Sequence, residues 1–112
     1  MKKLLIVWKT NNEIDIHNFV IPYAYNAKKH EWFSDVEVLI WGASQDKIKE
    51  DKLIQQRVNN LVKNEIQIFA CKMCADKVEA TAILEQLGVT VVYTGVYLSE
   101  KLKDPMYEVI TL

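Results

Sequence analysis

Hydrophobic residues in this chain gather in short continuous runs, the pattern of strands covered on both faces of a parallel sheet. Four such runs are Leu4–Trp8, Val36–Trp41, Ile66–Ala70 and Val89–Tyr93. A fifth segment, Tyr107–Leu112, alternates between apolar and polar residues, as an edge strand does. The pattern therefore predicts five strands, with Gly42 closing the second and Gly95 lying just beyond the fourth.

The segments between these runs carry helical periodicity. Phe19, Tyr23 and Ala27 share one stripe, with Val20 and Ala24 beside them. Pro22 is expected in the first turn of that helix, where its missing N–H costs nothing. Further helices are predicted over Asp46–Asn64, Met73–Leu87 and Val96–Lys103. Ser44 is the candidate N-cap of the first of these, and Gly88 the C-cap of the second.

This alternation of strands and helices predicts an α/β fold. We expect a single three-layer α/β/α domain over residues 1–112, with a mostly parallel five-stranded sheet and helices on both of its faces. In such folds ligands bind beyond the carboxyl ends of the strands. Candidate functional residues are therefore sought where strands end.

Composition and charge narrow the function classes. The 14 basic and 15 acidic residues leave a net charge of −1, which argues against nucleic-acid or membrane-surface partners. No apolar run approaches the roughly 18 residues of a membrane-spanning helix. Leu4–Trp8 is also too short for the apolar part of a signal peptide. We expect a cytoplasmic protein, and without a glycine-rich phosphate loop we predict no cofactor.

The chain has two cysteines, Cys71 and Cys74, in a C-x-x-C spacing. Cys71 follows the third predicted strand, and Cys74 falls in the first turn of the next helix. The N-terminus of a helix favours an anion, and Lys72 and Lys77 add positive charge. Both features favour the reactive thiolate or the anion of a persulfide. The charge of Asp76 acts in the opposite direction, although it complements the helix dipole.

Several interpretations of this pair stay open. Cysteines are often small buried residues with no chemistry. A zinc site would need four ligands, and the only histidines, His17 and His30, lack ligand spacing. A dithiol redox pair fits the spacing, although Ala70 and Ala75 differ from the surroundings of a thioredoxin motif. The candidate residues at the rim of a pocket are Asn11, Asn12, Trp41, Ser44 and Asp76.

Four segments, taken in order, resemble the DsrE-like family of small α/β proteins, which includes sulfur-relay subunits. They are Ala24–Lys29 before Trp32-Phe33, Val36–Ser44, Ala70–Asp76 and Leu87–Val89. The resemblance implies a flavodoxin-like or Rossmann-like sheet and a homo-oligomer, often a trimer or hexamer. It also implies that Cys71 accepts sulfane sulfur as a persulfide. Cys74 is an additional thiol that could attack this persulfide and release sulfide.

The leading hypothesis is thus a sulfur-handling protein of the cytoplasm, a persulfide carrier or sulfurtransferase. Cys71 is the expected nucleophile and Cys74 the resolving thiol, while Lys72 and the helix amides stabilise the anion. Its partners would be a sulfur donor or acceptor protein. The alternatives are a non-catalytic homo-oligomeric module that binds a small ligand or a protein, and a dithiol redox switch.

Overall fold

The computed structural model describes residues 1–112 and contains one five-stranded sheet in the order β4-β3-β2-β1-β5, with every neighbouring pair parallel. The strands are β1 (Lys3–Trp8), β2 (Asp35–Ile40), β3 (Gln67–Cys71), β4 (Thr90–Val92) and β5 (Tyr107–Thr111). All five predicted strands are present, and the last one lies at an edge as expected. The predicted α/β fold with a five-stranded sheet is confirmed, and the sheet is entirely parallel.

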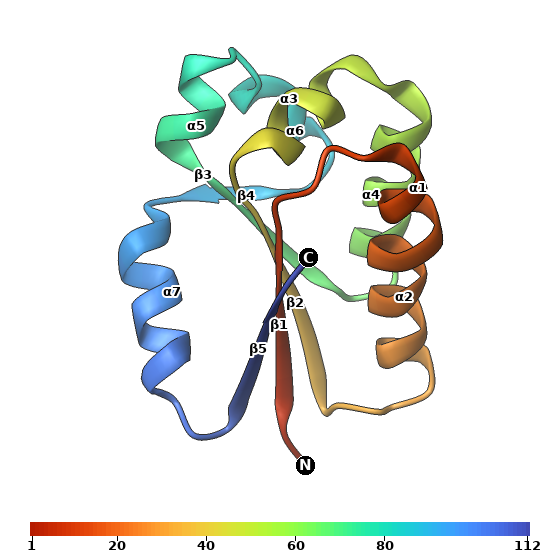
Figure 1. Ribbon diagram of the computed structural model, residues 1–112, viewed down its shortest axis with the longest axis vertical. Helices are drawn as coiled ribbons and strands as arrows, with labels where there is room; N and C mark the ends of the chain where they lie inside the picture. The colour runs from red at the N-terminus through yellow and green to blue at the C-terminus, as the bar shows by residue number, and fades with distance from the viewer.

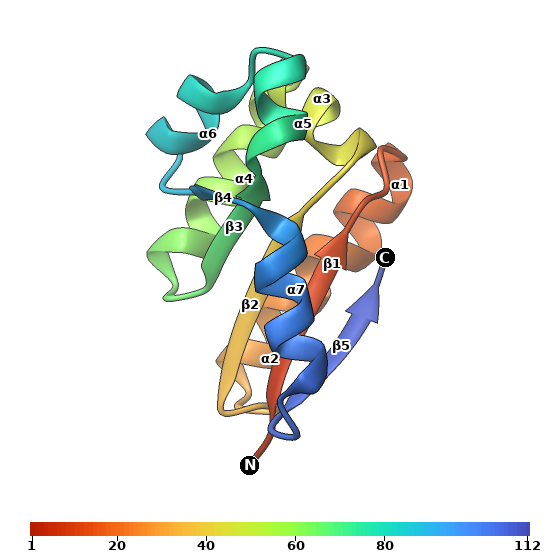
Figure 2. The ribbon, with the colours of Figure 1, turned by 90° about the vertical axis from the view of Figure 1, so that its left-hand side faces the viewer.

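The helices divide unequally between the two faces of the sheet. They are α1 (Glu13–Asp15), the π-helix η1 (Ile16–Val20), α2 (Ile21–Lys29), α3 (Ala43–Glu50), α4 (Lys52–Lys63), α5 (Lys72–Lys77), α6 (Thr81–Gln86) and α7 (Thr94–Lys103). From β1 to β4 the chain moves steadily across the sheet, so right-handed crossovers keep the connecting helices on one side. The chain then returns to β5 beyond β1, and α7 lies on the opposite side from α2 and α4 (Figure 1, Figure 2).

This arrangement produces a large core and a small one. The large core contains 22 buried residues and lies between the sheet and the helices of the first face. The small core consists of Leu5, Val7 and Leu39, with half-buried Phe69, Tyr97 and Leu98 packed against it. The second face of the sheet therefore depends on α7 for its cover.

The first helical segment differs from the prediction. It starts at Glu13 and passes through a π-helical turn, in which the Ile21 N–H bonds to the Ile16 carbonyl, before Pro22. Proline lacks an N–H and its ring would clash with the carbonyl four residues earlier, so a widened turn relieves both problems. The predicted stripe is also wrong at Phe19, which is 50% exposed, because the wide turn rotates the buried face onto Val20, Ala24 and Ala27.

The helix predicted over Asp46–Asn64 is two helices. The chain is extended at Asp51, with φ −118° and ψ 110°, and the Asp51 side chain accepts a hydrogen bond from the Ile54 N–H at 3.1 Å. Asp51 thus caps α4 and ends α3. The prediction of Ser44 as a cap is wrong, since Ser44 is buried within α3 and donates to the Trp8 carbonyl at 2.7 Å.

The helix predicted over Met73–Leu87 is also broken, between Lys77 and Thr81, where Glu79 has a φ of 56°. Gly88 does close this segment, as predicted. Its φ is 93°, and its N–H bonds to the Glu85 carbonyl at 3.1 Å while the next N–H, of Val89, bonds to Leu84 at 3.0 Å. These are the two hydrogen bonds of a Schellman C-cap.

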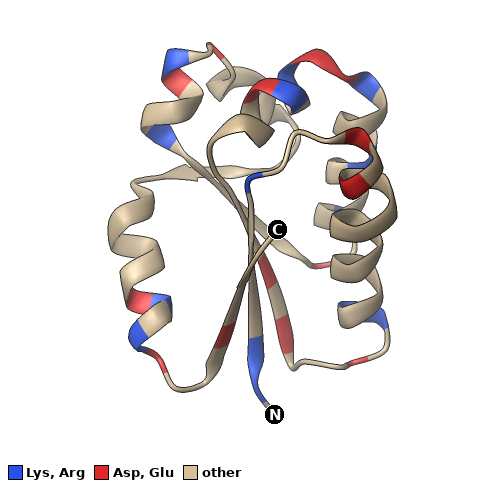
Figure 3. Ribbon diagram, in the orientation of Figure 1, with Lys and Arg blue, Asp and Glu red and all other residues tan.

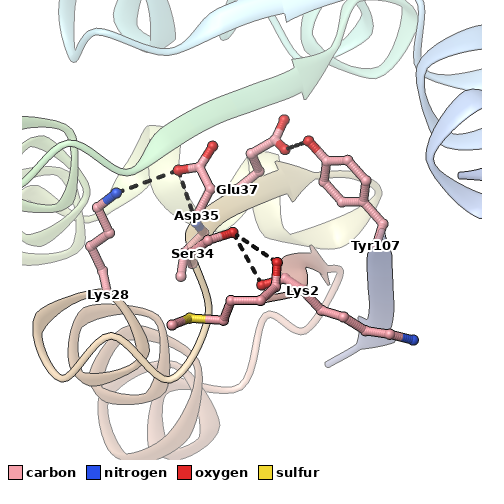
Figure 4. Close-up of polar contacts among 8 residues, drawn as sticks. Lys2, Lys28, Ser34, Asp35, Glu37 and Tyr107 are labelled. Atoms are coloured by element: carbon pink, nitrogen blue, oxygen red, sulfur yellow. Dashed lines mark hydrogen bonds and ion pairs between the residues drawn. The ribbon is translucent and has the colours of Figure 1, made fainter. Parts of the chain in front are cut away.

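A buried carboxylate fastens α7 to the sheet. Glu37, on β2, is 3% exposed and accepts hydrogen bonds from the hydroxyl of Tyr97 on α7, at 2.7 Å, and from that of Tyr107 on β5. Lys101 lies 3.8 Å from the same carboxylate. Burial and the neighbouring Glu37 raise the pKa of both tyrosines, so their hydroxyls stay protonated and donate. Figure 4 shows Glu37 and Tyr107 pointing toward each other.

Two polar contacts hold the amino end of β2, just before Glu37. Lys28 forms an ion pair with Asp35 at 3.4 Å, and the Ser34 hydroxyl lies 3.3 Å from the Lys2 carbonyl (Figure 4). These contacts join α2 and the start of β1 to the amino end of β2. These contacts therefore stabilise the sheet at the amino ends of its strands, away from the carboxyl ends.

Candidate functional site

Cys71 lies where the fold class predicts a site, at the carboxyl end of a strand. It is the last residue of β3 and the N-cap of α5, and its sulfur accepts a hydrogen bond from the Cys74 N–H at 3.4 Å. A short side chain with an acceptor atom is what an N-cap position requires, and here sulfur replaces the usual oxygen. The C-x-x-C spacing therefore creates both the cap and the pair of thiols.

The Cys71 side chain is set up to ionise. The residue is 6% exposed, and burial opposes its ionisation. Hydrogen bonds from the Thr94 hydroxyl, from the Cys74 thiol and from the Cys74 and Met73 amides outweigh that effect, so the pKa of Cys71 falls below that of a free thiol. A depressed pKa in a cysteine at a helix N-terminus is characteristic of a reactive thiol.

Cys74 has the opposite tendency. Burial and its hydrogen bond to Cys71 raise the pKa of the Cys74 thiol, and these effects outweigh the Gly42 amide and the positive charge of Lys77. Both cysteines are free, and Cys74 is the more exposed of the two. The directions of these two pKa shifts favour Cys71 as the thiol that ionises.

Lys72 and Asp76, two of the predicted site residues, bond to each other. The Lys72 Nζ lies 3.1 Å from the Asp76 carboxylate, which also accepts the Thr81 hydroxyl at 2.6 Å. The Thr81 hydroxyl and Lys72 lower the pKa of Asp76, and Asp76 raises that of Lys72. The cation of Lys72 thus has a carboxylate partner along α5.

Three of the other predicted rim residues take part in contacts within the fold. Ser44 is buried, Trp41 is half-buried against the small core, and the Asn12 side chain caps α1 through the Asp15 N–H at 3.1 Å. Asn11 is exposed. A pocket shared by these residues and the cysteines stays a prediction.

Two residues at this site were not predicted. Gln45 is fully buried, and its amide donates to the Ile40 carbonyl at 2.9 Å and to the Cys71 carbonyl at 3.2 Å, which joins the ends of β2 and β3. Thr94 is 4% exposed at the start of α7. Gln45 follows β2 and Thr94 follows β4, and the carboxyl ends of both strands lie at this end of the sheet. Their position after a predicted strand was the feature of the sequence that pointed to them.

The histidines lie elsewhere. His17 pairs with Arg57 at 2.7 Å, and the His30 ring stacks on Trp32 with centroids 5.6 Å apart. No three His, Cys, Asp or Glu side chains are grouped so that they could hold a metal ion. The longest helix, α4, has 12 residues, and no helix has the length and apolar character needed to cross a membrane.

Comparisons with known proteins agree with this fold. No protein-family model and no curated protein matches the chain. Among solved structures, it is similar to BT1422, a conserved protein of unknown function from Bacteroides thetaiotaomicron, with 31% identity over 99% of this chain and 95% of the other, and a TM-score of 0.94. It is also similar to the YchN protein of E. coli, with 19% identity over the full length of both chains and a TM-score of 0.75. YchN has the DsrE-like fold, so this chain has that fold too.

Proposed function

We propose that this chain, which belongs to the same family as BT1422 and has the DsrE-like fold, is a cytoplasmic sulfur-handling protein that carries sulfane sulfur on Cys71. The observation that carries the proposal is the position of Cys71, which ends β3 and caps α5 with its sulfur 3.4 Å from the Cys74 N–H. The hydrogen bonds at this position also lower the pKa of the Cys71 thiol. Free thiols of this kind persist in the reducing cytoplasm.

In the first step, the Cys71 thiolate attacks the terminal sulfur of a donor persulfide, R–S–SH. A sulfur–sulfur bond forms at Cys71 and the donor's own sulfur–sulfur bond breaks, so R–S⁻ leaves with the electron pair. The product is a persulfide on Cys71, and no external oxidant is needed. The amides of Met73 and Cys74, which already bond to the Cys71 sulfur, support the anion during this exchange.

The persulfide then has two fates. A thiolate on an acceptor can take the terminal sulfur and restore Cys71. Alternatively, the Cys74 thiolate attacks the inner sulfur, which forms a Cys71–Cys74 disulfide and releases HS⁻. In that case the two thiols are oxidised by two electrons and the sulfane sulfur is reduced to sulfide. The close contact of the two side chains favours this second route once Cys74 loses its proton.

Intact mass spectrometry after incubation with a small-molecule persulfide tests the proposal. The wild type is compared with Cys71→Ser and Cys74→Ser. A gain of one sulfur atom should require Cys71 and should last longer in Cys74→Ser, which cannot release sulfide. Full sulfur uptake by Cys71→Ser would refute the proposal. A loss of two hydrogens without any sulfur uptake would indicate a dithiol redox switch instead.

We also propose that copies of this chain associate through the surface next to the site. Met73, Tyr93 and Val96 are 64%, 72% and 65% exposed, and all three lie beside the cysteines or at the start of α7. Figure 3 shows that the half of α7 nearest this edge carries no charge, and residues 94–99 are uncharged in the sequence. An apolar surface of this kind, on a face with one covering helix, supports a homo-oligomer.

A further inference from the structure

Thr94 occupies an unusual position for a polar residue. It is 4% exposed and begins α7, two residues beyond Val92, which pairs with Cys71 across the β3–β4 ladder. Its hydroxyl acts on the Cys71 thiol, whose pKa it lowers. A buried hydroxyl costs free energy unless it has a hydrogen-bond partner. The group that this position offers to it is the Cys71 sulfur, at the end of the neighbouring strand β3.

The geometry of β3 and α7 places Thr94 beside Cys71. Phe69 and Cys71 alternate with Ala70 on β3, so their side chains project from the same face of the strand. Thr94 and Tyr97 are three residues apart on α7 and share a face of the helix. The Phe69 and Tyr97 rings lie 4.6 Å apart. This contact places Thr94, one turn before Tyr97, over Cys71, two residues after Phe69.

The contact between Phe69 and Tyr97 is firmly anchored. The Tyr97 hydroxyl donates to the buried carboxylate of Glu37 at 2.7 Å, while its ring packs on Phe69. This fixes the first turn of α7 against β2 and β3. The Thr94 hydroxyl is therefore held in place by the packing of the helix, and does not need to be ordered when the sulfur becomes charged.

From this geometry we propose that Thr94 is a positioning residue, whose hydroxyl donates to the Cys71 sulfur and holds it as a thiolate directed at the donor. The inference rests on the proposed function, since it assigns Thr94 a part in the reactivity of that same site. A hydroxyl is suited to the task because it can rotate to donate to a thiolate and to accept from a thiol. Valine has nearly the same shape and cannot do either.

The test compares Thr94→Val with Thr94→Ser. Alkylation by iodoacetamide is followed as a function of pH, and the two cysteines are read separately because trypsin cuts after Lys72. Peptide 64–72 then contains Cys71, and peptide 73–77 contains Cys74. Loss of one hydrogen bond should raise the midpoint of Cys71 alkylation by roughly half to one pH unit. Serine, which keeps the hydroxyl, should restore most of the shift.

Sulfur uptake provides the second readout. At neutral pH the rate of sulfur loading should fall by roughly 3- to 10-fold in Thr94→Val, in step with the smaller fraction of thiolate, and Thr94→Ser should recover it. A folded Thr94→Val protein with an unchanged Cys71 midpoint would overturn the inference. So would a valine effect that serine does not reverse.

A further variant separates the hydroxyl from the packing of α7. Tyr97→Phe loosens the anchor of the helix without removing the Thr94 hydroxyl, so it should shift the Cys71 midpoint less than Thr94→Val does. An equal shift would assign the effect to helix packing and overturn the inference. If the wild type takes up no sulfur but Thr94→Val still shifts the midpoint, the sulfur-carrier proposal fails while the role of Thr94 stands.

Discussion

The substitution Tyr97→Phe removes one hydroxyl from the buried polar cluster beneath α7. The ring stays, so its packing on Phe69, with centroids 4.6 Å apart, is preserved. What is lost is a 2.7 Å hydrogen bond to the buried Glu37 carboxylate, which keeps the hydroxyl of Tyr107 as a partner. A hydrogen bond to a charged group contributes about 1.5–3 kcal/mol to stability. We expect a loss near the lower end, because Tyr97 is partly exposed and water can reach its place.

Urea unfolding followed by circular dichroism measures this loss as a lower midpoint with an unchanged slope. Tyr25→Phe is the matched control, since no side chain accepts a hydrogen bond from the Tyr25 hydroxyl, and it should change the free energy of unfolding by less than about 0.5 kcal/mol. In a Glu37→Gln background the acceptor is neutral, so Tyr97→Phe should cost only about 0.5–1.5 kcal/mol. Equal losses for Tyr97→Phe and Tyr25→Phe would refute the idea that Glu37 fastens α7 to the sheet.

Gly88→Ala should destabilise the protein by about 1–3 kcal/mol, because Gly88 has a φ of 93° and a Cβ there would meet Val62 Cγ1 at 2.8 Å. Gly95→Ala, in open space within α7, should leave thermal stability unchanged or raise it slightly, and an equal loss for both would contradict the Schellman assignment. Val96→Asp should reduce the oligomer measured by sedimentation velocity, whereas Leu53→Asp, equally a change from an exposed apolar residue but on α4, should not. A wild-type protein that sediments as a monomer would remove the case for assembly through the start of α7.

The sequence predicts the strands well because their physical signal is strong and local. Continuous apolar runs such as Leu4–Trp8, which are short and contain β-branched and aromatic residues, are typical of strands in a sheet that is covered on both faces. The breaks within the helices were missed for an equally physical reason. Ile48 and Ile54 are both buried, so the apolar pattern continues through Asp51, where the chain is in fact extended. Nothing in that pattern distinguishes one long helix from two helices that share a core.

The candidate site was predicted in part. Cys71 could be placed from the sequence because a strand end followed by a helix start is a local pattern. Gln45 and Thr94 could not, because a buried polar residue looks like a surface one until the fold brings its partner to it. The predicted role of Lys72 beside the thiolate stays a prediction, and the structure adds that its ammonium lies 3.1 Å from the Asp76 carboxylate.

Site-resolved mapping of the added sulfur tests the central claim most directly. The wild-type protein is incubated briefly with a persulfide donor, capped with iodoacetamide and digested with trypsin. The additional sulfur should be found on peptide 64–72, which contains Cys71, with the disulfide between the two peptides increasing later as sulfide is released. Sulfur found first on peptide 73–77, which contains Cys74, would contradict the account.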